Sequence, residues 1–166
     1  SGNYAQGGSG ANTLCMHNKP EYPDGYNDND NAGNRLYGME YQDTGAIDKN
    51  NDEDAACVVC EHNTASTVYV QWGRSKTCSN GHHLQYAGLI MSNKYDQKKG
   101  ESVCVDLERA VHPGNSGNNN NGGLLYTTEM RAGSSDEVLY PPGREVGCAV
   151  CSPTKQTAVF SRWGST

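Results

Sequence analysis

Oxygen-bearing side chains alternate along one short acidic segment of this sequence. Residues 48–54 carry them at every second position, as Asp48, Asn50, Asp52 and Asp54. Calcium takes about six to eight hard oxygen ligands, so this spacing favours a calcium-binding loop. The segment is not an EF-hand, because Asp52 is not followed by glycine and no glutamate closes the loop. We expect these four side chains to hold Ca²⁺; a solvated acidic turn is the other interpretation.

A second acidic loop, residues 24–30, has a similar chemistry. Its carboxylate, amide and aromatic side chains include those of Tyr26, Asp28 and Asp30. A bound cation is an effective way to hold so many carboxylates together. A flexible polar loop without a ligand is the alternative.

Repeated residues elsewhere are weaker candidates for chemistry. Glu40 and Glu129 occupy matched positions and could form the carboxylate pair of a glycosidase, but a shared structural role is favoured. For Trp72 and Trp163, which also match, core packing is favoured over sugar stacking. The sequence contains no nucleophile motif, phosphate loop or zinc-protease motif. We therefore expect a protein that is not an enzyme.

Cysteine usage indicates an oxidising compartment. The chain has seven cysteines, and only 34% of its residues are hydrophobic. Because so few apolar residues are available for a core, disulfides would supply part of the stability. Disulfides contribute about 2–4 kcal/mol each and persist in secreted proteins. We expect disulfide bonding rather than zinc binding, with one sulfur left for a bond between chains or for a free thiol. The cysteines are Cys15, Cys57, Cys60, Cys78, Cys104, Cys148 and Cys151.

An internal repeat organises the sequence. Cys15 precedes the segment 36–40 as Cys104 precedes the segment 125–129, at an offset of 89 residues. Two further pairs of segments match at an offset of 91: residues 57–60 with 148–151, and residues 68–73 with 159–164. Residues 78–89 occur once, so Cys78 has no counterpart. We expect one domain over residues 1–166, built from repeat units 1–77 and 78–166.

The predicted elements are strands. Short apolar runs rich in β-branched and aromatic residues predict strands at residues 68–72, 84–91, 123–129 and 158–163. No long segment has a helical apolar period, so helices should be minor. The sequence predicts an all-β, compact, β-sandwich-like domain of two duplicated, phase-shifted units, stapled by disulfides.

Charge and hydropathy exclude several classes of partner. The net charge of −6 argues against a nucleic-acid backbone. No apolar run approaches the length of about 18 residues that a membrane span requires. No leader-like segment is visible at the start of the sequence, so we expect the mature form of a secreted protein.

Four segments carry a resemblance to known families: residues 7–15, 36–41, 57–60 and 72–74. Together they resemble the non-collagenous domain of invertebrate short-chain, spongin-like collagens, over nearly the whole chain. The size, the odd number of cysteines and the phase of the repeat are similar to the calcium-dependent galactose-binding lectins of sea anemones. This resemblance implies a secreted, disulfide-linked homodimer that binds terminal β-galactose on glycans through Ca²⁺.

A lectin of this kind would bind sugar where the loops of the first repeat meet. Calcium can accept vicinal sugar hydroxyls as ligands, while an aromatic ring packs against the sugar and carboxylates orient its other hydroxyls. We expect the sugar-binding residues to be Tyr26, Asp28, Asp30 and Glu40. The alternative function is a non-catalytic module of the extracellular matrix, related to the short-chain collagens.

Overall fold

The computed structural model of the chain describes residues 2–7, 10–24, 33–42, 50–61, 67–113, 122–134 and 136–163. Within them it has six strands and a single short 3-10 helix, so the all-β prediction is confirmed. The chain divides into two compact units, and each unit is built from three separate segments of the sequence. Unit 1 comprises residues 1–59, 92–101 and 110–126, and unit 2 comprises residues 60–91, 102–109 and 127–166.

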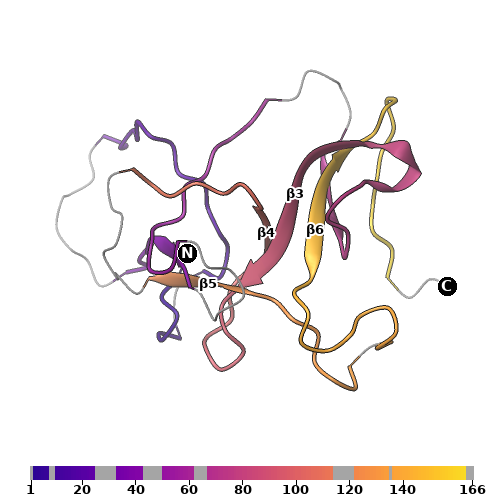
Figure 1. Cartoon of the computed structure of the whole chain (residues 1–166). Coiled ribbons are helices and arrows are strands. Elements are labelled where there is room, and N and C mark those ends of the chain that lie inside the picture. Colours follow the sequence, from indigo (N-terminus) through magenta and orange to yellow (C-terminus); the bar gives the residue numbers. More distant parts are fainter. Residues whose placement is uncertain are drawn as a thin grey trace. The chain divides into compact units, whose positions relative to one another are not determined.

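Unit 2 is organised around an antiparallel sheet of four strands, three of which are labelled in Figure 1. Strand β6 lies between β3 and β2, and β4 pairs with the other edge of β3. A bulge shifts the β3–β6 register between Leu84 and Tyr86. The strands are β2 (Tyr69–Trp72), β3 (His83–Ser92), β4 (Val103–Asp106) and β6 (Gly147–Ser152). The central position of β6 explains why five of its six residues are buried.

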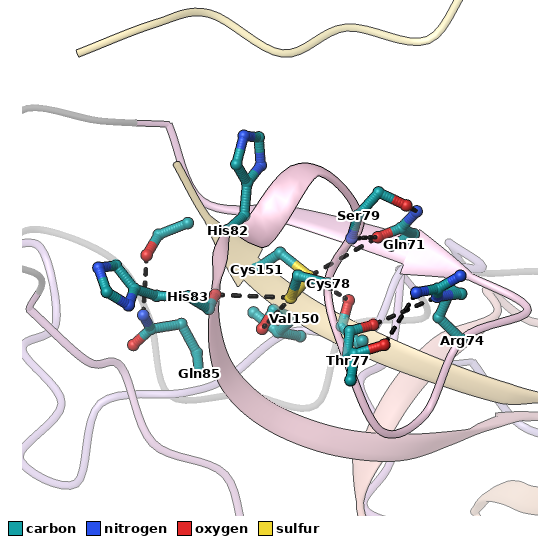
Figure 2. Close-up of a disulfide and its surroundings, with 12 residues drawn as sticks. Gln71, Arg74, Thr77, Cys78, Ser79, His82, His83, Gln85, Val150 and Cys151 are labelled. Atoms are coloured by element: carbon teal, nitrogen blue, oxygen red, sulfur yellow. Dashed lines mark hydrogen bonds between the residues drawn. A yellow bond between two sulfur atoms is a disulfide. The ribbon is translucent and has the colours of Figure 1, made fainter. Parts of the chain in front are cut away.

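Two disulfides tie β6 to its surroundings. Cys148 bonds to Cys104 of β4, and Cys151 bonds to Cys78, which precedes the 3-10 helix η1 (Ser79–Gly81). Figure 2 shows the second bond beside Gln71 of β2, whose side-chain oxygen accepts a hydrogen bond from the Ser79 backbone N–H at 2.9 Å. The Cys78–Cys151 disulfide and the hydrogen bonds of the sheet therefore hold the same strand, β6.

Unit 1 has a smaller ladder. Strand β1 (Met39–Tyr41) runs parallel to β5 (Gly123–Thr127), with Met39 opposite Gly123. On its other side, residues 53–55 run antiparallel to β1, and the Ala55 N–H donates to the Met39 carbonyl at 2.8 Å. Residues 110–112 continue the ladder through the bridge between Ala55 and Val111. The core contains Leu124 and Leu125 of β5.

Disulfide pairing follows the repeat. Cys15 bonds to Cys57 in unit 1, and their counterparts Cys104 and Cys148 bond to each other in unit 2. The remaining sulfur belongs to Cys60, which is exposed and free within the chain. Its counterpart in the repeat, Cys151, is bonded to Cys78, which lies in the unrepeated segment 78–89.

The predicted strands are only partly correct. Strands at residues 68–72, 84–91 and 123–129 correspond to β2, β3 and β5. The strand predicted at 158–163 is wrong: these residues form no strand, because no ladder partner lies against them in the described chain. Core packing was also wrongly predicted for Trp72 and Trp163, whose side chains are exposed. No helix in the described residues has the length and apolarity that a bilayer crossing requires.

We predict that removing the Cys78–Cys151 bond destabilises the protein by about 2–5 kcal/mol, because it closes a separation of 73 residues inside the core. The double variant Cys78→Ser/Cys151→Ser is compared with wild type in equilibrium urea unfolding. Val138→Ser, at a position that is 89% exposed, is the control and should stay within about 0.5 kcal/mol of wild type. Equal stability of all three proteins would contradict the role assigned to this bond.

A second prediction concerns Gly88 of β3. A Cβ at this position would lie 2.7 Å from the sulfur of Cys104 and 3.0 Å from that of Cys148. The nearest atom, the Val105 carbonyl oxygen, would lie 2.6 Å away. Gly88→Ala should lower the free energy of unfolding by about 1–3 kcal/mol, because neither this backbone oxygen nor the disulfide sulfurs can move without straining the sheet. Gly38→Ala is the control, since its Cβ would meet no atom within 4 Å. A harmless Gly88→Ala would show that the disulfide has room to shift.

Candidate functional site

The structure describes half of the residues predicted to bind a ligand. Asp48 of the calcium set and Tyr26, Asp28 and Asp30 of the sugar set lie outside the described residues. Glu40, Asn50, Asp52 and Asp54 are all described, and all belong to unit 1. The geometry of the site is therefore built from these four and their neighbours.

A reversal of the chain at residues 50–52 brings Asn50 and Asp52 beside β1. Asn50 and Asp52 adopt left-handed backbone conformations, with φ of 73° and 59°. Asn and Asp tolerate this region better than other residues with side chains. The turn then returns along β1, where the Asp52 N–H donates to the Tyr41 carbonyl and the Tyr41 N–H donates to the Glu53 carbonyl, each at 2.9 Å.

Side chains from β1 and from this turn form a carboxylate–amide cluster, made of Glu40, Gln42, Asn50, Asp52 and Glu53. The Gln42 amide donates to Asp52 Oδ1 at 2.8 Å and to Glu40 Oε1 at 3.3 Å. Asn50 donates to Glu53 Oε2 at 2.8 Å. Glu40 is only 1% exposed. Two carboxylates that would repel each other thus share one amide group.

The cluster has the ligand chemistry of a calcium site, because carboxylate and amide oxygens are the donors that Ca²⁺ prefers. Its described carboxylates are oriented toward Gln42 and Asn50, however, and no three acidic, His or Cys side chains of the described chain converge as metal ligands. Asp54 lies one step along the ladder, opposite Glu40, and its carbonyl accepts from the His112 N–H. The residue types fit calcium, and the described contacts are those of a hydrogen-bonded network.

Glu40 and Glu129 occupy equivalent places in their own units. Glu40 lies opposite Asp54 in unit 1, and Glu129 lies opposite Glu145 in unit 2. The repeat relates the two pairs, because Glu129 follows Glu40 by 89 positions and Glu145 follows Asp54 by 91. Their surroundings differ, because Glu40 is buried whereas Glu129 is exposed. This equivalence supports a structural role for the position. In unit 1 the glutamate side chain is also buried.

A cavity that the sequence did not indicate lies in unit 1, with a volume of about 250 Å³. Its polar lining includes Gln6, Asn93 and Glu101, and Met39 of β1 lies in its wall. Alternate residues of a strand point to opposite faces, so the neighbouring Glu40 faces away from the cavity. No motif could reveal it, because its lining comes from residues 2–7, residues 10–13, residue 39 and residues 93–101.

The adjacent histidines of unit 2 do not act together. His82 Nδ1 lies 2.8 Å from the Tyr69 hydroxyl, and the two rings meet edge to face. Figure 2 shows the rings of His82 and His83 pointing in different directions. Separate orientations fit a structural role for His82 better than chelation of a metal by the pair.

Tyr86, in β3 of the same unit, has a shifted pKa. Burial raises the pKa of Tyr86, and the nearby carboxylate of Asp106 raises it further. Its hydroxyl donates to the Cys104 carbonyl at 2.9 Å. Like an ordinary tyrosine, Tyr86 is protonated at neutral pH, and it serves as a hydrogen-bond donor within the sheet.

We predict that Gln42→Met weakens the fold by about 1–3 kcal/mol, because the carboxylates of Glu40 and Asp52 each lose a hydrogen bond in a half-buried setting. The measurement is urea unfolding in EDTA. Gln156→Met, at an exposed position, is the control and should change stability by less than about 0.5 kcal/mol. A Gln42→Met protein as stable as its control would mean that the amide is dispensable.

Comparisons with models of protein families, with curated proteins and with solved structures find no match to this chain. No family membership or activity is therefore transferred to it from a relative. A functional assignment depends on the residues themselves, and above all on the carboxylate–amide cluster beside β1.

Proposed function

We propose that this protein is a calcium-dependent lectin that binds terminal β-galactose on glycans. The observation that carries the proposal is the carboxylate–amide cluster, in which Gln42 joins the carboxylates of Glu40 and Asp52. The identity of the sugar comes from the resemblance to sea-anemone lectins.

The chemistry of the proposed site follows from its oxygen donors. Calcium would be held by Asp48, Asn50, Asp52 and Asp54, and it would offer remaining coordination positions to two sugar hydroxyls. Tyr26 would pack against the apolar face of galactose, and Asp28, Asp30 and Glu40 would orient its other hydroxyls. Binding requires no bond to be made or broken, so the proposed protein is not an enzyme.

Three intramolecular disulfides support an extracellular location. We propose that the protein is secreted and acts as a homodimer, linked through the exposed thiol of Cys60. Two sites on one dimer would allow the cross-linking of glycans even if each site is weak.

A second candidate is a non-catalytic module of the extracellular matrix. It is favoured by the exposed apolar side chains of Val58, Val59, Phe160 and Trp163. Large apolar groups at a surface are typical of protein interaction sites. Such a module would bind a matrix protein and would show no dependence on sugar.

Calorimetric titration with galactose, in calcium and again in EDTA, tests the lectin proposal. We expect heat of binding in calcium that disappears in EDTA, because chelation removes the ion that coordinates the sugar. Asp52→Asn should weaken galactose binding at least tenfold, which corresponds to about 1.4 kcal/mol. Asp96→Asn is the matched control, because Asp96 forms only an exposed ion pair with Lys94 and should not affect binding.

The other results of this titration have different meanings. Heat of equal size in both buffers would retain a lectin and remove calcium from its site. No heat in either buffer would reject galactose binding and leave the matrix module as the leading candidate. Unchanged binding by Asp52→Asn would move the site away from the carboxylate–amide cluster.

A further inference from the structure

The cavity of unit 1 arises where two segments of unequal length are held together. The Lys98 N–H donates to the Tyr4 carbonyl at 3.0 Å. The Glu101 N–H donates to the Ala11 carbonyl, also at 3.0 Å. Seven positions of the sequence separate the two acceptors, whereas only three separate the two donors. The two segments therefore cannot pack evenly along each other, and residues of both line the cavity.

The volume of this cavity suits a small organic molecule. It measures about 250 Å³, and every residue that lines it belongs to unit 1. Drug-sized ligands fill pockets of about 300–1,000 Å³, whereas one water takes up about 30 Å³ of liquid. The cavity thus has more room than a single ion or water needs and less than a drug-sized ligand fills. A single sugar ring is an occupant of the right size.

Hydrogen-bond acceptors in the lining are already used by the protein. Gln6 Oε1 accepts from the Tyr37 hydroxyl at 3.1 Å. Asn93 Oδ1 accepts from a backbone N–H of β5 at 3.3 Å. Glu101 Oε2 accepts from the Thr13 N–H at 2.7 Å. What these side chains leave for a ligand is one oxygen of the Glu101 carboxylate and the groups that can donate.

Several donors of the lining have no partner. The Thr13 hydroxyl oxygen is buried, and no group in the part of the chain that the structure describes is hydrogen-bonded to it. A buried polar group without a partner carries a desolvation cost that a ligand can relieve. Lys98 and Lys99 form no ion pair with any described residue, whereas Lys94 of the same loop pairs with Asp96 at 3.4 Å.

Two unpaired cations at one cavity favour an anionic ligand. The chain as a whole carries a net charge of −6, so this local charge is opposite to the overall one. Lys98 and Lys99 are exposed, so an anion can reach them from solvent. Hydrogen bonds from an ammonium group to a carboxylate are stronger than those between neutral groups. The remaining lining, which includes Met39 and Glu101, suits the apolar face and the hydroxyls of a ring.

We propose that the cavity of unit 1 binds an acidic monosaccharide, a sugar ring that carries one carboxylate. The ligand carboxylate would accept hydrogen bonds from Lys98 and Lys99. Its hydroxyls would bond to the Thr13 hydroxyl and donate to the Glu101 carboxylate, and Met39 would contact the apolar face of the ring.

This site is separate from the proposed calcium site. Met39 lies in the wall of the cavity, whereas Glu40, the next residue of β1, points to the opposite face of the strand. Binding of an acidic sugar here needs no metal, and binding of galactose at the carboxylate–amide cluster needs neither lysine. Each proposal can therefore fail while the other stands.

Calorimetric titration in EDTA with D-glucuronate and D-galacturonate tests the inference. D-glucose and D-galactose are the neutral counterparts, and acetate supplies the charge without the ring. We expect at least one of the two uronates to bind about tenfold or more tightly than its neutral counterpart and than acetate. Equal affinity for the neutral sugar would remove the role of the lysines, and equal affinity for acetate would reduce the site to one for simple anions. Absence of binding by both uronates would reject the site.

The lysines are tested by the double variant Lys98→Gln/Lys99→Gln. Uronate affinity should fall about tenfold or more, because the carboxylate loses both ammonium partners. Lys19→Gln/Lys76→Gln is the matched control: it removes the same charge at exposed positions outside the lining and should bind uronate as wild type does. Equal losses in both proteins would assign the effect to net charge and overturn the site. Galactose binding in calcium should be the same in both proteins.

Thr13→Val separates a role in binding from a role in the fold. The variant should be at least as stable as wild type in urea unfolding, because the hydroxyl that it removes has no hydrogen-bond partner in the described chain. Uronate affinity should fall about threefold or more, because the ligand loses a hydrogen bond. A variant that binds uronate as tightly as wild type, or that loses stability and keeps its affinity, would overturn the assignment of this hydroxyl to the ligand.

Discussion

The sheet of unit 2 depends on how closely two sulfurs can approach the backbone of β3. The Cys104–Cys148 bond lies against Gly88, where any side chain would meet both sulfurs. Glycine at that position lets hydrogen bonds join β4, β3 and β6 while the disulfide passes over β3 from Cys148, opposite Gly88, to Cys104, opposite Ile90. Cys148, in turn, is completely buried, so the disulfide adds to a core that contains few large aliphatic side chains.

Much of the fold could be predicted from the sequence because its signals are local. Alternating β-branched and aromatic residues marked β2, and short apolar runs at residues 84–91 and 123–129 marked β3 and β5. The strand β1 has only three residues, too few for a periodic pattern to be visible. Residues 158–163 carry the right pattern and yet form no strand, because strand formation needs a partner and sequence periodicity does not report one.

The candidate site was predictable in composition and not in contacts. The alternation of Asn50, Asp52 and Asp54 drew attention to an acidic segment, and the side chains of Asn50 and Asp52 do join the cluster. Gln42, which joins two of the carboxylates, carried no sequence signal. Its role arises because Asn50 and Asp52 take left-handed conformations that return the chain along β1. The cavity in unit 1 is a stronger case, since its lining combines distant segments that no short motif connects.

The alternation of the chain between its two units has a consequence for folding. The backbone passes from one unit to the other after residues 59, 91, 101, 109 and 126, so neither unit is a continuous stretch of sequence. A ribosome that has released the first hundred residues has completed neither core. Contacts between distant parts of a chain close slowly, and partly formed sheets aggregate meanwhile. Neither core can therefore close until the segments 110–126 and 127–166, which complete units 1 and 2, are available.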